Sequence, residues 1–156
     1  MTSTGPPPLR PFGLVLHHDG RWSHEGQPIL NRKLREHFDR SVEYVPDECK
    51  YIVRLKHFRG EIEVEEAAFF VREIDAEAGE VALSDGTRSA LDLATLHASP
   101  IDEALLCHVK HGAAPGGLLA RFTHAAQSEL LDAVELDEDD VPGIVWKGRF
   151  TPLPAL

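Results

Sequence analysis

The chain has 156 residues, of which 42% are hydrophobic and 27% charged, and its formal net charge at pH 7 is −10. This composition is that of a folded globular protein, and the length suffices for one ordinary domain or two small ones with a buried core. The acidic balance argues against a general nucleic-acid binder, because phosphate binding needs a basic face. No apolar run approaches the roughly 18 residues of a membrane span, and the first residues lack the apolar core of a secretory signal. We therefore expect a cytoplasmic protein that binds neither nucleic acid nor a membrane.

Residues 1–12 are rich in proline and predict an extended, disordered tail. After the tail, a strand, a turn at Asp19-Gly20 and a second strand carrying Trp22 predict a hairpin, since Asp-Gly supplies the left-handed backbone of such turns. Asn31 is a favoured N-cap and marks the start of a short helix with Leu34 and Phe38 on one face. These elements form the core of the N-terminal α+β half, which we place at residues 13–65.

Residues 42–91 change to a period of two and predict an antiparallel meander of four or five strands, with a further strand over residues 104–110. Leucine, phenylalanine and alanine then recur at helical spacing, which predicts the longest helix of the chain over residues 118–134. A final strand pair surrounds a turn at Lys147-Gly148. We group residues 66–156 as a barrel-like C-terminal half. Because glycine-marked turns precede both predicted helices, the order of elements permits a duplication.

An ordered series of short motifs extends from residue 14 to about residue 152. The motifs are Asp19-Gly-x-Trp22, Gly26-x-Pro28-Ile29, Arg32 with Leu34 and Phe38, Tyr51-Ile-Val, Ile62-x-Val64-Glu65-x-Ala67, Phe69-Phe-Val, Gly117-Leu-x-Ala-Arg121 and Gly143-Ile-Val-Trp146-x-Gly148-x-Phe150. This series resembles the bacterial domain-of-unknown-function family 1285. The chain resembles a divergent member, because it lacks a Thr-Pro segment after Tyr51-Ile-Val and has His124 where the family pattern has arginine.

This resemblance implies an α+β fold made of two related halves, the C-terminal one loosely similar to pleckstrin-homology-like barrels. It also implies a small-molecule pocket between the halves for a nucleotide-like ligand, and a role in signalling. These expectations come from the resemblance and not from composition or spacing.

The sequence itself offers one candidate anion site. Gly117 opens the helix predicted from residue 118, and helix N-termini present free N–H groups and a positive dipole to phosphate. Arg121 would lie one turn into this helix, and Arg32 holds the matching place in the first helix. Further basic residues that could gather there are Lys110, Lys147 and Arg149. The alternative is that the glycines before residue 118 form an ordinary turn.

Trp22 and Trp146 have two readings as well, packing in a core or stacking on a ligand ring. The predicted ligand-binding residues are Arg32, Arg121, Arg149, Trp22, Trp146 and Gly117. No cofactor, metal ligand or catalytic residue is assigned.

Other chemistry finds weaker support. The nine histidines lack the helical pair spacing of zinc hydrolases, and neither Ser23 nor Ser128 lies in a Gly-x-Ser-x-Gly elbow. Cys49 and Cys107 read as two buried, reduced thiols, with a single disulfide as the alternative.

Our leading hypothesis is a non-catalytic module that binds a nucleotide-like or other anionic small molecule between its halves. One alternative is a metal-assisted hydrolase that uses the histidines. The other is a protein-interaction module whose acidic loop, residues 135–140, binds a basic partner. The oligomeric state is left open.

Overall fold

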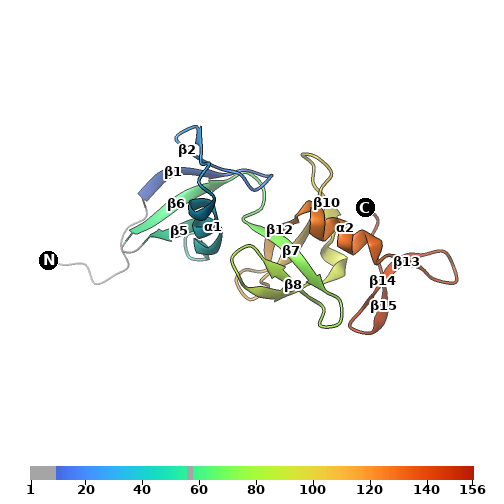
Figure 1. Ribbon diagram of the computed structural model, residues 1–156. Helices are drawn as coiled ribbons and strands as arrows, with labels where there is room; N and C mark the ends of the chain where they lie inside the picture. The colour runs from blue at the N-terminus through green and yellow to red at the C-terminus, as the bar shows by residue number, and fades with distance from the viewer. Residues whose placement is uncertain (1–9, 56–57) are drawn as a thin grey trace. The chain divides into compact units, whose positions relative to one another are not determined.

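The computed structural model describes residues 10–55 and 58–156, and the chain divides into two compact units, Met1–Ala68 and Phe69–Leu156 (Figure 1). Each unit contains a six-stranded sheet and one α-helix, so the architecture is α+β, as predicted. The boundary falls a few residues beyond the expected one at 65/66. Within the described part of the chain, neither helix has the length and apolar character needed to cross a membrane.

The sheet of the N-terminal unit is built from two runs of three strands separated by a helix. Its order is β3-β2-β1-β6-β5-β4, with β1 and β6 parallel at the centre and every other pair antiparallel. Helix α1 contacts β5. The elements are β1 (Arg10–Leu16), β2 (Trp22–His24), β3 (Gln27–Pro28), α1 (Arg32–Ser41), β4 (Val42–Val45), β5 (Lys50–Leu55) and β6 (Phe58–Val64).

The sheet of the C-terminal unit repeats this topology. Its order is β10-β11-β12-β7-β8-β9, and the first strand of one run again pairs in parallel with the last strand of the other, β7 with β12. A 3-10 turn, η1 (Leu93–Thr95), takes the place of α1 between the two runs. The strands are β7 (Phe69–Asp75), β8 (Glu80–Leu83), β9 (Arg88–Ala90), β10 (His97–Ala98), β11 (Leu105–Val109) and β12 (Leu118–Phe122). The two halves are therefore related by strand order and direction, as a duplication requires.

The C-terminal unit then adds elements that have no counterpart in the first unit. Helix α2 (His124–Asp132) contacts β7 and β12. A three-stranded antiparallel sheet follows, formed by β13 (Glu135–Leu136), β14 (Pro142–Trp146) and β15 (Arg149–Pro152).

The helix predicted over residues 118–134 is wrong in its first part. Residues Leu118–Phe122 form β12, which lies between β11 and β7, and only His124–Asp132 are helical. A central strand is buried on both faces and reads as a continuous apolar run, which periodicity cannot distinguish from a buried helix. Thr123 separates the two elements, since its hydroxyl accepts the backbone N–H of Ala126 at 3.2 Å as the N-cap.

Two further expectations need correction. The meander predicted over residues 42–91 is divided between the sheets, with β4-β5-β6 in one and β7-β8-β9 in the other. Alternation along each strand does not reveal which strands share a sheet. The proline-rich tail ends sooner than expected, because Arg10 and Pro11 already pair with Gly60 and Glu61 in β6. Residues 1–9 lie outside the described part of the chain.

The N-terminal core is organised around Trp22, which is 1% exposed. Its ring packs against Phe38 of α1 with centroids 5.3 Å apart, and its indole N–H donates to the Asp39 carboxylate at 2.8 Å. Asn31 begins α1 as predicted, accepting the N–H of Leu34 at 3.0 Å. Phe38 is buried, whereas Leu34 is 42% exposed, so the apolar face of this helix is narrower than its sequence indicates.

We expect Asn31→Ala to lower the free energy of unfolding by about 1 kcal/mol, because the N–H of Leu34 loses its acceptor. Urea unfolding followed by Trp22 fluorescence, in a Trp146→Phe background, measures this. Asn31→Asp keeps the cap and should stay near wild type. Equal losses in both variants would contradict a capping role.

The two cysteines are free thiols, and only Cys107 is buried. Cys49, expected to be buried, lies exposed in the turn between β4 and β5, where its φ is 51°. Burial in β11 raises the pKa of the Cys107 thiol to about 12.

This difference predicts selective alkylation. At pH 8 iodoacetamide should modify Cys49 in the native protein, whereas Cys107 should react only in denaturant, because its thiolate is scarce and shielded. Mass spectrometry of wild type and Cys49→Ser counts the adducts. Modification of native Cys49→Ser would show that Cys107 is accessible.

Candidate functional sites

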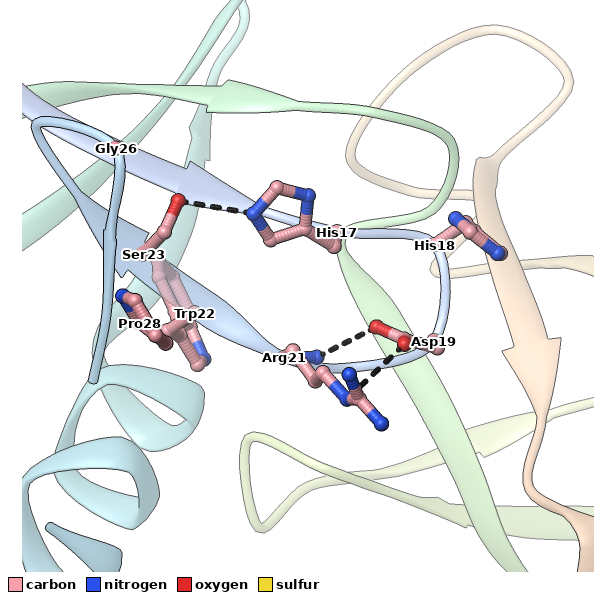
Figure 2. A pocket seen from close by; sticks show the side chains of 8 residues that line it. All are labelled: His17, His18, Asp19, Arg21, Trp22, Ser23, Gly26 and Pro28. Carbon is pink, nitrogen blue, oxygen red and sulfur yellow. Dashed lines mark hydrogen bonds and ion pairs between the residues drawn. The ribbon is translucent and has the colours of Figure 1, made fainter. Parts of the chain in front are cut away.

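A concave site lies within each unit. The first, which we call the hairpin pocket, has a volume of about 360 Å³ and lies at the β1–β2 turn (Figure 2). This volume, and the volume of about 320 Å³ of the second site in the C-terminal unit, fall within the size range of small-molecule pockets. The hairpin pocket is lined by His17, His18, Asp19, Arg21, Trp22, Ser23, Gly26 and Pro28.

The turn of this hairpin is fixed by local hydrogen bonds. The N–H of His17 donates to the carbonyl of Arg21 at 2.8 Å, and the N–H of Gly20 donates to the carbonyl of His17 at 3.0 Å. Gly20 has a φ of 89°, which glycine adopts without a steric penalty. The Asp19 carboxylate accepts the N–H of Arg21 at 3.1 Å and lies 3.3 Å from the Arg21 guanidinium, so Arg21 folds back over the turn (Figure 2).

The same hairpin brings His17 to Ser23. Ser23 pairs with Val15 across the strands, and His17 follows Val15 by two residues, so the two side chains are diagonal neighbours on one face. Figure 2 shows the imidazole directed at the hydroxyl, with 2.9 Å between His17 Nε2 and Ser23 Oγ.

Glu65 completes this network from the end of β6. The parallel pairing of β1 with β6 places Glu65 beside His17, and its N–H donates to the carbonyl of Leu16 at 3.0 Å. Its carboxylate meets His17 Nδ1 at 3.2 Å and also contacts Nδ1 of His18. The hydrogen bond with His17, and next the one with His18, lower the pKa of Glu65, so the carboxylate is ionised at neutral pH.

The second site, which we call the Trp146 hollow, lies in the C-terminal unit and has a volume of about 320 Å³. The indole N–H of Trp146 donates to the carbonyl of Leu91 at 3.1 Å, and the N–H of Lys147 donates to the carbonyl of Ala76 at 2.8 Å. These two bonds attach the β14–β15 hairpin to the six-stranded sheet. The hollow is lined by Ala90, Leu91, Asp92, Leu93, His111, Trp146, Lys147 and Thr151.

Two basic side chains, Lys147 and His111, line this hollow beside its apolar residues. Within residues 10–55 and 58–156, Lys147 forms no ion pair and His111 no side-chain hydrogen bond. The Lys147 stem rests on Gly79, where an added Cβ would come within 2.4 Å of Lys147 Cε. An added Cβ at Gly117 would likewise lie 2.9 Å from His111 Nδ1, so Gly117 allows the imidazole to approach the backbone.

The predicted helix N-terminus at Gly117 does not exist, because Gly117 precedes strand β12. Arg121 lies within that strand, is 7% exposed and is paired with the Asp102 carboxylate. Arg32 is the first residue of α1, is 84% exposed and pairs with Glu36 at 2.9 Å. The helix start predicted to place Gly117 beside Arg121 is therefore not formed. Neither arginine lines the hairpin pocket or the Trp146 hollow.

The other predicted residues lie nearer to the two sites. Trp22 and Trp146 each contribute a buried wall, to the hairpin pocket and the Trp146 hollow respectively. Arg149 is exposed and stands directly opposite Trp146 in the β14–β15 register.

The histidines are spread through both units. His108 in β11 packs edge-on against His97 at 5.6 Å between centroids, and His111 lies beyond the end of that strand. No three histidine, cysteine or acidic side chains of the described segments have the arrangement of a metal site.

Sequence reasoning missed the grouping of His17, Ser23 and Glu65. The Asp-Gly turn was a usable signal for the first two, because a tight hairpin makes residues on its two strands neighbours. Glu65 had no such signal, since its position depends on a parallel pairing between segments almost fifty residues apart.

The fold is that of a duplicated α+β protein, and a small concave site lies within each half. In fold as in its series of motifs, the chain resembles the DUF1285 family. A DUF1285 family protein from Silicibacter pomeroyi DSS-3 has a TM-score of 0.63 at 20% identity over 97% of this chain and 89% of that one. Another, from Shewanella baltica OS155, has a TM-score of 0.52 at 15% identity over 77% of this chain and 91% of that one. No protein-family model and no curated protein matches the sequence.

The segment that carries His111 is held in place by a shielded ion pair. Lys110 Nζ lies 2.6 Å from Asp85 Oδ2 and 4.7 Å from the centroid of the Phe69 ring. Burial raises the pKa of Asp85, but the hydrogen bonds from Lys110 and Thr87 outweigh it, so the pKa is lowered.

We therefore expect Asp85→Asn to lower the free energy of unfolding by about 2 kcal/mol at pH 7. A carboxylate whose pKa is lower in the folded than in the unfolded state stabilises the fold at pH values above its unfolded-state pKa. This stabilisation is lost as the pH falls through the folded-state pKa. The difference between wild type and variant should thus shrink below about pH 4. Urea unfolding at pH 7 and pH 3 measures it.

Asp139→Asn serves as the control, because Asp139 is exposed in the acidic loop. Its effect should stay within about 0.5 kcal/mol. A difference for Asp85→Asn that does not change with pH would contradict the role of its charge.

Proposed function

We propose that the protein binds a small anionic molecule with an apolar or aromatic body, such as a nucleotide-like ligand, in the Trp146 hollow. The observation that carries this proposal is the Lys147 ammonium, which lines the hollow and has no carboxylate partner among the residues that the structure describes. In a protein with a net charge of −10, a lysine without a carboxylate partner is available to an anionic group.

The backbone of Lys147 supports a role beyond the turn. Lys147 has a φ of 55° and Gly148 a φ of 75°, so both residues of this tight turn are left-handed. Asparagine, aspartate or glycine is favoured at the first of these positions, and lysine is disfavoured there. Backbone strain of this kind is found most often at functional sites.

The surroundings of Lys147 suit a ligand with two chemical parts. Leu91, Leu93 and the wall formed by Trp146 offer apolar contact, while Lys147 and His111 face the anionic part. Arg149 adds positive charge beside Trp146, because residues directly opposite in an antiparallel pair have side chains on the same face. The Asp92 carboxylate is occupied in capping η1, accepting the N–H of Ala94 at 2.9 Å.

In our proposal, the Trp146 hollow binds its ligand and does not convert it. The Thr151 hydroxyl donates to the carbonyl of Arg149 at 3.2 Å, so the lining offers no hydroxyl activated by a base. The pocket lies wholly within the C-terminal unit, whereas the family resemblance implied one between the halves. A module that binds a small molecule without converting it is suited to cytoplasmic signalling, and we propose that setting for it.

Isothermal titration of the full chain with adenosine monophosphate, and separately with inorganic phosphate, tests the proposal. We expect the nucleotide to bind more tightly than phosphate, because only the nucleotide fills the apolar part of the hollow. Lys147→Ala should weaken nucleotide binding about tenfold, equivalent to about 1.4 kcal/mol.

Lys33→Ala is the matched control, since Lys33 is an exposed lysine of α1 and lines neither site. It should bind the nucleotide like wild type. No binding to a fully folded protein, or equal losses in both lysine variants, would reject the hollow as the site.

A further inference from the structure

We propose that Ser23, His17 and Glu65 form a nucleophile–base–carboxylate relay in the hairpin pocket, able to hydrolyse small carboxylic esters. This activity belongs to the N-terminal unit and does not depend on ligand binding in the Trp146 hollow. The three side chains come from β2, the turn after β1 and the end of β6.

The hydrogen bonds determine where the protons lie. Glu65 is ionised and can only accept, so the proton shared with His17 resides on Nδ1. A neutral imidazole then has its lone pair on Nε2, the atom 2.9 Å from Ser23 Oγ. The hydroxyl therefore donates to His17, which is the arrangement that a general base needs to activate a serine.

The relay has the access that a reaction requires. Only 9% of Ser23 is exposed, but Ser23 and His17 both line the pocket, which opens a path to the hydroxyl. The side chains of His17 and Glu65 are 36% and 37% exposed, so water can reach the base. His18 also contacts the Glu65 carboxylate and helps to hold it in place.

Arg21 is the group that stabilises developing negative charge. It comes directly before β2 and lines the pocket together with Ser23. Its Nε faces Asp19, and the guanidinium as a whole carries five N–H donors in a fixed fork. Positively charged donors of this kind stabilise the oxyanion of a tetrahedral intermediate.

The reaction balances without any cofactor. Ser23 Oγ attacks the ester carbonyl carbon while its proton passes to His17 Nε2. The tetrahedral intermediate expels the alcohol, whose oxygen receives that proton, and an acyl ester on Ser23 is left. Water then attacks the acyl carbon and gives a proton to His17, which returns it to Ser23 as the carboxylic acid leaves.

A fluorophosphonate probe tests the nucleophile directly on the full chain. Ser23 should displace fluoride and form a phosphonyl ester, which mass spectrometry locates on the peptide. Hydrolysis of p-nitrophenyl acetate gives a second readout. We expect Ser23→Ala and His17→Gln each to lower labelling and hydrolysis at least about 100-fold.

Three further variants separate catalysis from folding. Ser128→Ala, an exposed serine of α2, should behave as wild type. Glu65 is a positioning residue, so Glu65→Gln should lower labelling at least about tenfold, and Glu65→Asp, which keeps the charge, should recover part of it.

The proposal is overturned if the folded wild type gives no Ser23 adduct, or if Ser23→Ala hydrolyses the ester at the wild-type rate. Labelling of Ser23 that persists in His17→Gln would also overturn the relay. Probe labelling and ester hydrolysis are measured on wild type and on variants with a single substitution. Thermal unfolding of each variant confirms that it is folded.

Discussion

The parallel strand pair at the centre of each sheet is the constraint on which the rest of the structure depends. In the N-terminal unit it aligns Leu16 with Val64, and the residue that follows, Glu65, donates its N–H to the carbonyl of Leu16. In the C-terminal unit the matching bond runs from Thr123 to the carbonyl of Val71. Parallel strands need a long connection, and here four strands supply it in each half, together with α1 in the first and η1 in the second.

The residues after these two parallel pairs carry different chemistry. Glu65 orients two histidines beside a serine, whereas Thr123 caps α2. The C-terminal unit instead carries two basic residues, Lys147 and Arg149, on the added β14–β15 hairpin. Two halves of one topology thus present unlike surfaces, because fold fixes the positions of side chains and the residues at those positions decide the chemistry.

Local signals in the sequence were reliable where neighbours in the chain decide the structure. The Asp19-Gly20 turn, the Asn31 cap and the strand character of residues 42–91 all depend on short-range sterics and hydrogen bonds, and each is present. The helix expected from residue 118 failed at β12, where a strand buried on both faces imitates the apolar run of a helix. The anion site built on that helix was lost with it.

The sequence by itself determined the fold class, the hairpins, the first helix and the resemblance to the DUF1285 family. Tertiary structure alone decided which strands share a sheet, that Arg121 is paired and buried, and that His17, Ser23 and Glu65 meet. The reason is physical: caps and turns are made within a few residues, whereas parallel pairing joins segments far apart in the chain. Pairing at that range depends on burial in the whole sheet, which no local pattern encodes.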